Sequence, residues 1–248
     1  MKKKILLLSG VILVIGLISS IAIAQNLSVD IGESTTRTAV QLILLLTVLS
    51  LAPSILIMIT SFTRIIVVLS LLRTALGVQQ TPPNTVLIGL ALFLTAFIMA
   101  PTFQTAWENG ILPYIDGELA EEEAIESSLD PFRTFMLGHT REEDLRLFVD
   151  MAGLTNLEGP DDVPTHVIIP SFMISELRRA FEIGFLLFLP FLIIDLTIAS
   201  LLMSMGMMMV PPVIVSLPFK IVFFVLVDGW HMVAGSLVQG YSGGIGAG

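Results

Sequence analysis

The sequence predicts an all-α, polytopic membrane protein with two helical hairpins, kinked or broken helices and a small acidic helical insert outside the cytoplasm. Of its 248 residues 54% are hydrophobic and 13% are charged, and the mean hydropathy is +0.91. A soluble domain is rarely so apolar. Several apolar segments approach the ~20 residues that cross a bilayer as a helix. Prolines lie within or beside these segments, and one polar region between them holds most of the acidic residues.

The N-terminus predicts a secretory signal that is removed from the mature protein. Three lysines at residues 2–4 precede an apolar stretch over 5–23, and Ala22 and Ala24 provide the small residues of a cleavage site directly before Gln25. A basic start, an apolar core and a small-x-small site are typical of secretory signals. We therefore predict cleavage after Ala24. The alternative is an uncleaved anchor helix, because the apolar run exceeds the ~7–15 residues usual for a signal core.

Four apolar segments of the mature chain are candidates for membrane helices. The first covers 40–59, is broken by Pro53 and is followed by a further apolar stretch over 65–76. The other three cover 85–103, 183–203 and 213–238. Proline inside a helix removes a backbone hydrogen bond and kinks or breaks the helix. Pro53, Pro190 and Pro218 therefore predict irregular helices.

The expected topology follows from the signal. After cleavage the mature chain starts outside the cytoplasm and its first span runs inward. The connection over 60–84 then lies inside, where Arg64 and Arg73, without any acidic neighbour, fit the positive-inside rule. The next span returns outward. The polar middle region and the C-terminus, which follows the second hairpin, are both expected outside.

The polar region over 104–165 is expected to form an acidic helical insert. It holds fifteen of the 21 acidic residues of the chain. The pattern from Thr140 to Glu143 resembles a capping box, and Asp130 followed by Pro131 resembles a helix start. The chain is thus predicted to divide into a signal at 1–24, a first hairpin within 25–103, an insert at 104–169 and a second hairpin with a C-terminal tail at 170–248.

A methionine-rich run lies between the last two apolar segments. Gly206 lies inside it, and the prolines at 211–212 close it. Five of the twelve methionines fall here: Met203, Met205, Met207, Met208 and Met209. Thioether side chains are flexible and polarizable, so they adapt to changing surfaces and suit a seal around a variable cargo. Filling of gaps between membrane helices is the commoner use of methionine and is the alternative.

Several ionisable residues lie inside or beside the apolar segments, where charge is costly and usually has a function. Four of them share one expected helix at spacings that allow mutual neutralisation: Glu176, Arg178, Arg179 and Glu182. We predict that these four stabilise contacts within or between protomers. Three more lie within the last two apolar segments: Asp195, Lys220 and Asp228. For them, a structural ion pair between helices or protomers is the alternative to a functional role.

Patterns of catalytic chemistry are missing from the sequence. The chain has no cysteine, and its three histidines have no metal-ligand spacing. It contains neither a phosphate-binding GxxxxGK[ST] loop nor a GxSxG nucleophile elbow. We therefore predict no enzymatic activity, no cofactor, no metal site and no nucleic-acid partner.

Three long motifs follow one another along the chain: Pro53–Arg64 with its continuation to Gly77, Pro170–Phe185, and Pro218–Trp230. Together they resemble the FliP family of flagellar type III export-gate proteins. The resemblance covers nearly all of the mature chain and is weakest across 104–165. Virulence injectisomes contain close relatives of this family. The cleavable signal and the long acidic insert favour the flagellar branch.

The resemblance implies a core subunit of the export gate in the bacterial inner membrane, at the flagellar basal body. Family members form a ring of several copies, expected to number five, with FliQ and FliR homologues, other export-apparatus proteins and membrane lipid. The ring surrounds the passage for unfolded flagellar subunits. A methionine-rich loop lines its constriction, and Met207, Met208 and Met209 occupy that position here. Family helices lie largely above the bilayer plane, so the four-span topology describes insertion rather than the final assembly.

Two other functions stay open at this point. A proton-coupled small-solute transporter could use Asp195 in a relay at the middle of the membrane. Few spans and no inverted repeat speak against it. A purely structural ring would nucleate assembly without gating, and the sequence does not separate it from a gate, because both need a tightly packed oligomer.

Overall fold

The computed structural model describes residues 33–78, 80–155, 157, 159–207 and 209–242, and these form helices and turns only. The predicted cleavage site at Ala24 and Gln25 lies outside the described residues. The chain divides into two units, 1–53 and 54–248. Helix α2 (Glu33–Met58) accounts for the described part of the first unit. It continues through Pro53, so the predicted break there is wrong; the chain turns after Met58 instead.

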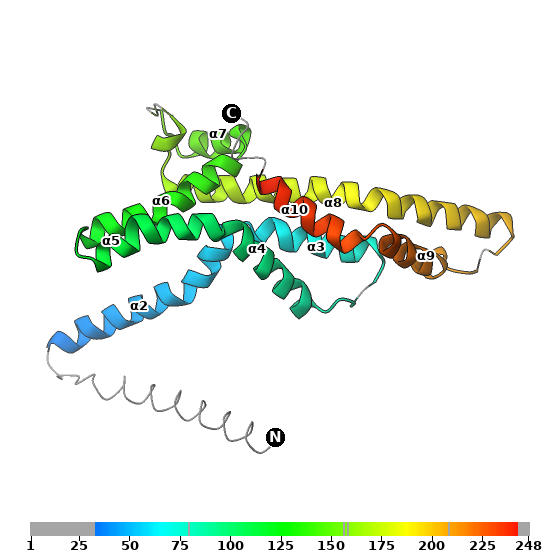
Figure 1. The fold of residues 1–248 in the computed structure, drawn as a ribbon, viewed down its shortest axis with the longest axis horizontal. Helices are drawn as coiled ribbons and strands as arrows, with labels where there is room; N and C mark the ends of the chain where they lie inside the picture. Colours follow the sequence, from blue (N-terminus) through cyan, green and yellow to red (C-terminus); the bar gives the residue numbers. More distant parts are fainter. Residues whose placement is uncertain (1–32, 79, 156, 158, 208, 243–248) are drawn as a thin grey trace, which may run out of the picture. The chain divides into compact units, whose positions relative to one another are not determined.

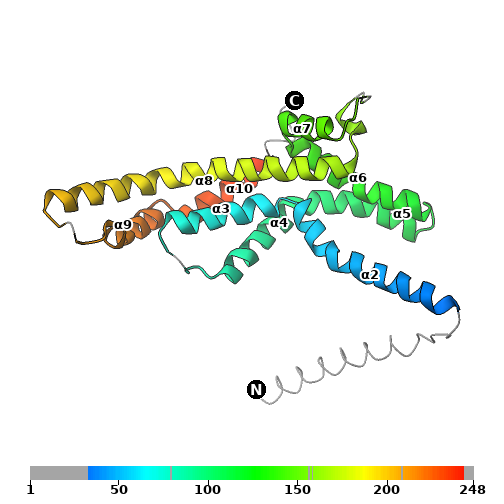
Figure 2. The same ribbon diagram turned by 180° about the vertical axis from the view of Figure 1, so that it is seen from behind.

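Helix α3 (Phe62–Ala75) is the centre of the second unit. It runs alongside α8 (Thr165–Ser204) in both ribbon views (Figures 1 and 2). Its buried residues recur at helical spacing and form one core with α4, α8, α9 and α10: Ile65, Val68, Leu69, Leu72 and Ala75. Apolar residues three or four positions apart form a stripe along one side of a helix, and that side is expected to face the core. Packing against four helices explains why a 14-residue helix is stable.

Helix α4 (Asn84–Ala106) continues without a turn into a π-helical segment (Trp107–Ile111) and then α5 (Leu112–Ile115). The expected helix over 85–103 therefore extends well into the polar region. The π-helical segment is where α6 (Glu121–His139) packs closely. A side chain at Gly110 would collide with the backbone of Ser128, its Cβ lying 2.7 Å from the amide nitrogen.

The acidic region is helical, as expected, but its helices start elsewhere. Pro131 lies inside α6 rather than at a helix start, and α7 (Glu142–Met151) is preceded by Arg141 at its N-cap. Thr140 is not a cap, because its hydroxyl donates to the carbonyl oxygen of Met136. A short 3₁₀ turn (Pro160–Asp162) follows. These elements close a second core with α4 and the start of α8, around Met99, Phe132, Met136, Ile168 and Phe172.

Helix α8 has 40 residues and is about 60 Å long, roughly twice the ~30 Å hydrocarbon core of a bilayer. Its first half packs on α3 and α7, whereas its most apolar 18-residue window is only 6% buried. Helices α9 (Pro212–Leu226) and α10 (Gly229–Ser242) follow, with a bend of 61° between them. Pro190 and Pro218 lie inside continuous helices, and the 61° bend falls at Val227 and Asp228.

Two or three of the four predicted spans are found among the described residues. Among the described residues, two helices are long and apolar enough to cross a membrane, Asn84–Ile115 and Thr165–Ser204, or three if the bent α9–α10 pair is one span. Helix α3 reaches only about 21 Å, and the apolar stretch found in α2 covers Thr38–Leu51. The all-α membrane class is confirmed, and the fourth predicted span, over 40–59, stays a prediction.

Candidate functional site

The methionine-rich turn is a regular helix end. Helix α8 stops at Ser204, and Gly206 has the positive φ of +72° that terminates it. The amide of Gly206 donates to the carbonyl of Met203 at 3.0 Å, and that of Met207 donates to the carbonyl of Leu202 at 3.0 Å. These two bonds form a Schellman motif, which satisfies carbonyls that a helix end leaves free. Pro212 then starts α9 at a position where proline is favoured.

The side chains of this turn are exposed in the single chain. Met209 is 97% exposed, and Met203, Met205 and Met207 are also on the surface. Met208 lies outside the described residues. Methionine that fills gaps between helices would be buried, so the methionines described here do not pack inside their own protomer. They form a flexible apolar tip between two long helices.

Replacing Gly206 is expected to distort this turn. An L side chain in the left-handed region costs about 1–2 kcal/mol, so Gly206→Ala should lower the free energy of unfolding by that amount and misplace the methionines. Gly235→Ala in α10 is the matched control, because its Cβ meets nothing within 4 Å and alanine favours helices. Thermal unfolding in detergent measures the stability of the two purified variants. Equal stability of the two variants would show that the turn does not need its glycine.

A polar cluster lies one or two helical turns behind the methionines. Lys220 on α9 forms an ion pair of 2.6 Å with Asp195 on α8, and Ser216 donates a 2.6 Å hydrogen bond to the same carboxylate. The ammonium also donates to the carbonyl of Ala75, in the last turn of α3, at 3.2 Å. A cation is favourable at the C-terminus of a helix. One side chain, Lys220, therefore fixes three helices relative to one another.

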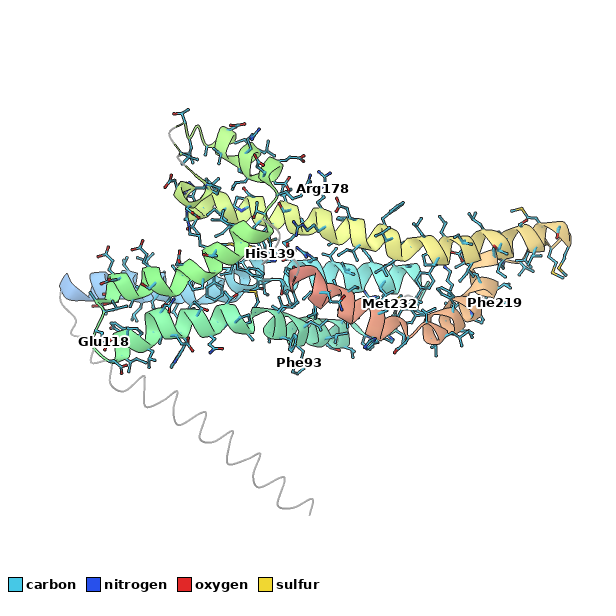
Figure 3. All side chains as sticks on the ribbon, turned by 45° about the horizontal axis from the view of Figure 1, so that its top comes forward. Phe93, Glu118, His139, Arg178, Phe219 and Met232 are labelled. Atoms are coloured by element: carbon cyan, nitrogen blue, oxygen red, sulfur yellow. The ribbon has the colours of Figure 1, made fainter. Side chains whose placement is uncertain are left out.

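A second cluster lies where α3, α6, α8 and α10 meet. Arg64 and Glu176 form an ion pair whose side chains are 2% and 0% exposed. The hydroxyl of Tyr241 donates to the same carboxylate, and the guanidinium of Arg64 lies 3.9 Å from the centre of the Tyr241 ring. His139 packs on that ring at the end of α6 (Figure 3). The cluster ties the C-terminal helix to the first hairpin.

The predicted group on α8 divides between two environments. Arg178 and Glu182 form the expected i, i+4 pair at 3.1 Å, but on an exposed face. Glu176 turns away from them to Arg64. Arg179 is half-buried and makes no ion pair with any described residue. Asp228 is exposed with a φ of +50°, and it forms the bend between α9 and α10.

Sequence reasoning missed two partners in these clusters. Arg64 was interpreted as a charge of the connection over 60–84, but it lies in α3 and is buried in an ion pair with Glu176. Tyr241 was placed in a tail, but it lies in α10. One signal could have found the pair. Arg64 and Glu176 each interrupt apolar sequence, and isolated charges in such segments usually pair with one another.

Neither cluster resembles a catalytic centre. Within the described residues, no group of three or more His, Cys, Asp or Glu side chains could hold a metal ion. The two clusters instead join helices, and an apolar tip and uncovered apolar helices surround them. Together these features define a polytopic, all-α membrane subunit whose apolar surface needs lipid or other chains to cover it.

Comparison with known proteins identifies the family. The sequence profile of the FliP family matches residues 45–237. A flagellar biosynthetic protein FliP from Caulobacter vibrioides is 57% identical over 223 residues, which cover 90% of this chain and 84% of the relative. Its counterpart from Bacillus subtilis is 54% identical over 87% of this chain and 98% of the relative. The one from Pectobacterium carotovorum is 53% identical over 85% and 81%. The chain belongs to the FliP family.

Proposed function

We propose that this chain is a ring-forming core subunit of the flagellar type III protein export gate, in which the methionine turns of several copies meet and seal the passage for unfolded flagellar proteins. Five copies and neighbouring FliQ and FliR homologues are the assembly we expect. As a FliP-family member, the chain is a non-enzymatic membrane component of the flagellar export apparatus. Ring formation and the methionine seal are the parts of this proposal that go beyond family membership.

The exposure of the methionine turn carries this proposal. Met209 is almost fully exposed at the tip of a hairpin. Exposure of an apolar side chain to water is unfavourable, and its burial would lower the free energy. Convergence of several copies would bury these side chains against one another. Because thioethers make weak, non-directional contacts, the ring could close when empty and yield around a passing polypeptide. The uncovered apolar surface of α8 supports burial against copies or lipid in the same way.

Replacement of Met207, Met208 and Met209 by alanine tests the seal. Small side chains would leave a gap, so we expect ion leakage across the membrane of cells that express the variant. Replacement by leucine keeps the apolar character with less flexibility, so sealing should survive better than export rate. The measurements are ion conductance of the cells and secretion of flagellar subunits.

A control removes methionines elsewhere. Met151 at the end of α7 and Met232 in α10 are 74% and 56% exposed, so Met151→Ala with Met232→Ala should leave conductance unchanged. A triple alanine variant that stays tight and exports normally would return the turn to a packing role.

A further inference from the structure

A groove of about 780 Å³ runs along one side of α6 in the acidic region. Ile125 and Leu129 of α6 form its apolar edge, and they are 55% and 56% exposed. Its other walls come from the 3₁₀ turn with Asp161, from the start of α8 and from Ile55 near the end of α2. A second hollow of about 420 Å³, lined by Tyr114 of α5 among others, lies on the other side of the same two residues. Ile125 and Leu129 are therefore an exposed apolar ridge between two hollows.

Carboxylates line the groove beside this ridge. Glu122, Glu126 and Asp130 recur every four residues along α6, and Asp161 lies on another wall. None of these four forms an ion pair with a described residue. Like charges four residues apart destabilise a helix. Among the described residues, no ion pair relieves this repulsion along α6.

The cation that lines the groove is already engaged. Arg133 donates hydrogen bonds to the backbone carbonyls of Asp161 and Val163, so it braces the 3₁₀ turn against α6. The remaining arginines of this region, Arg141 and Arg146, are paired with Glu143 and Glu142 on or beside α7. If a second copy of this region docked at the groove, it would present more carboxylates, together with arginines that are already bonded within their own copy. A second copy therefore does not complement the charge of the groove. An anionic lipid surface would be repelled.

We propose that this groove binds a cationic amphipathic helix of another protein. The spacing of the ridge, four residues on one helix, suits apolar side chains presented at i and i+4 by a partner helix that lies along it. Lysine or arginine on the flanks of that helix would meet the carboxylates that line the groove. The apolar ridge supplies the affinity, and the carboxylates select the charge and register of the partner. The proposal is independent of the methionine seal.

A pair of synthetic helices tests it on the full-length chain in detergent. One peptide carries leucines on one face and lysines on the flanks, and the other replaces every lysine by glutamate. The groove variant combines Glu122→Gln, Glu126→Gln and Asp130→Asn, which keeps the shape and relieves repulsion on α6, so it should fold. The control variant combines Glu108→Gln, Glu118→Gln and Glu123→Gln, which removes the same charge outside the groove; Glu118 lies in the turn before α6 (Figure 3).

The lysine peptide should bind the wild-type chain and the control, and bind the groove variant about tenfold more weakly at low salt. The glutamate peptide should bind none of them. If the groove variant and the control lose the same affinity for the lysine peptide, net charge alone explains the binding and the groove proposal is wrong. Absence of binding to the wild-type chain would also overturn the proposal. Because the chain has no cysteine, Leu129→Cys supplies a unique crosslinking site. A crosslink between two copies through this site would assign the groove to self-association and equally overturn it.

Discussion

Replacement of Arg64 by alanine is expected to prevent stable folding of the chain and its assembly. Glu176 is fully buried, so the change leaves a carboxylate without its counter-ion in a medium where a charge is poorly solvated. Breaking a buried ion pair from one side typically costs about 3–5 kcal/mol. Since domains are stable by only about 5–15 kcal/mol, a large part of the margin would be lost. Native gels of membrane extracts report the assembled form, and denaturant unfolding in detergent reports the stability.

Two further variants isolate the buried charge. Arg146→Ala removes an arginine from the exposed pair with Glu142, which is worth ~0–1 kcal/mol, so this control should assemble normally. Arg64→Met combined with Glu176→Leu removes both charges and should recover much of the stability. The hydroxyl of Tyr241 would then keep only the carbonyl of Ser61, at 3.5 Å, as an acceptor, so Tyr241→Phe completes the set. Normal assembly of Arg64→Ala on its own would contradict a structural role for the pair.

The sequence predicted those features that local chemistry determines. Apolar runs specified the helices, the prolines at 211–212 specified the break between α8 and α9, and the spacing of Arg178 and Glu182 specified their ion pair. Composition alone also predicted the membrane class. Each of these depends on residues within about one helical turn of one another, or on averages over a segment, and these are the quantities that a sequence displays directly.

Features that depend on distant residues were predicted wrongly or missed. Irregular helices were expected at Pro53, Pro190 and Pro218, but α2, α8 and α9 each continue through their proline. The sharp bend lies instead at Asp228, where the following Gly229 lets α10 approach the ring of Phe224; a Cβ there would lie 2.1 Å from that ring. The partner of Glu176 lies 112 residues earlier in the chain. No local spacing links such positions, so only the packed structure identifies them.

Replacement of Lys220 by methionine is expected to loosen the second hairpin. Methionine fills similar volume, but Asp195 loses its counter-ion and the carbonyl of Ala75 loses its donor. Asp195 is 32% exposed and keeps Ser216, so the cost should lie near 3 kcal/mol, the low end of the range for a broken buried pair. Denaturant unfolding of the purified chain measures the loss. Lys220→Met with the stability of the wild-type chain would show that water replaces the ion pair at no cost.

The double variant Lys220→Met with Asp195→Leu separates two roles for Asp195. If the ion pair only holds α8, α9 and α3 together, removing both charges should restore stability and flagellar export nearly to the wild-type level. If Asp195 carries protons, as a transporter would require, stability should recover while transport stays lost. The contacts of Asp195 with Lys220 and Ser216 favour the structural role, because they use both carboxylate oxygens inside one protomer. We therefore expect export to be rescued along with folding, and the coupling energy of the double-mutant cycle to account for most of the single-variant loss.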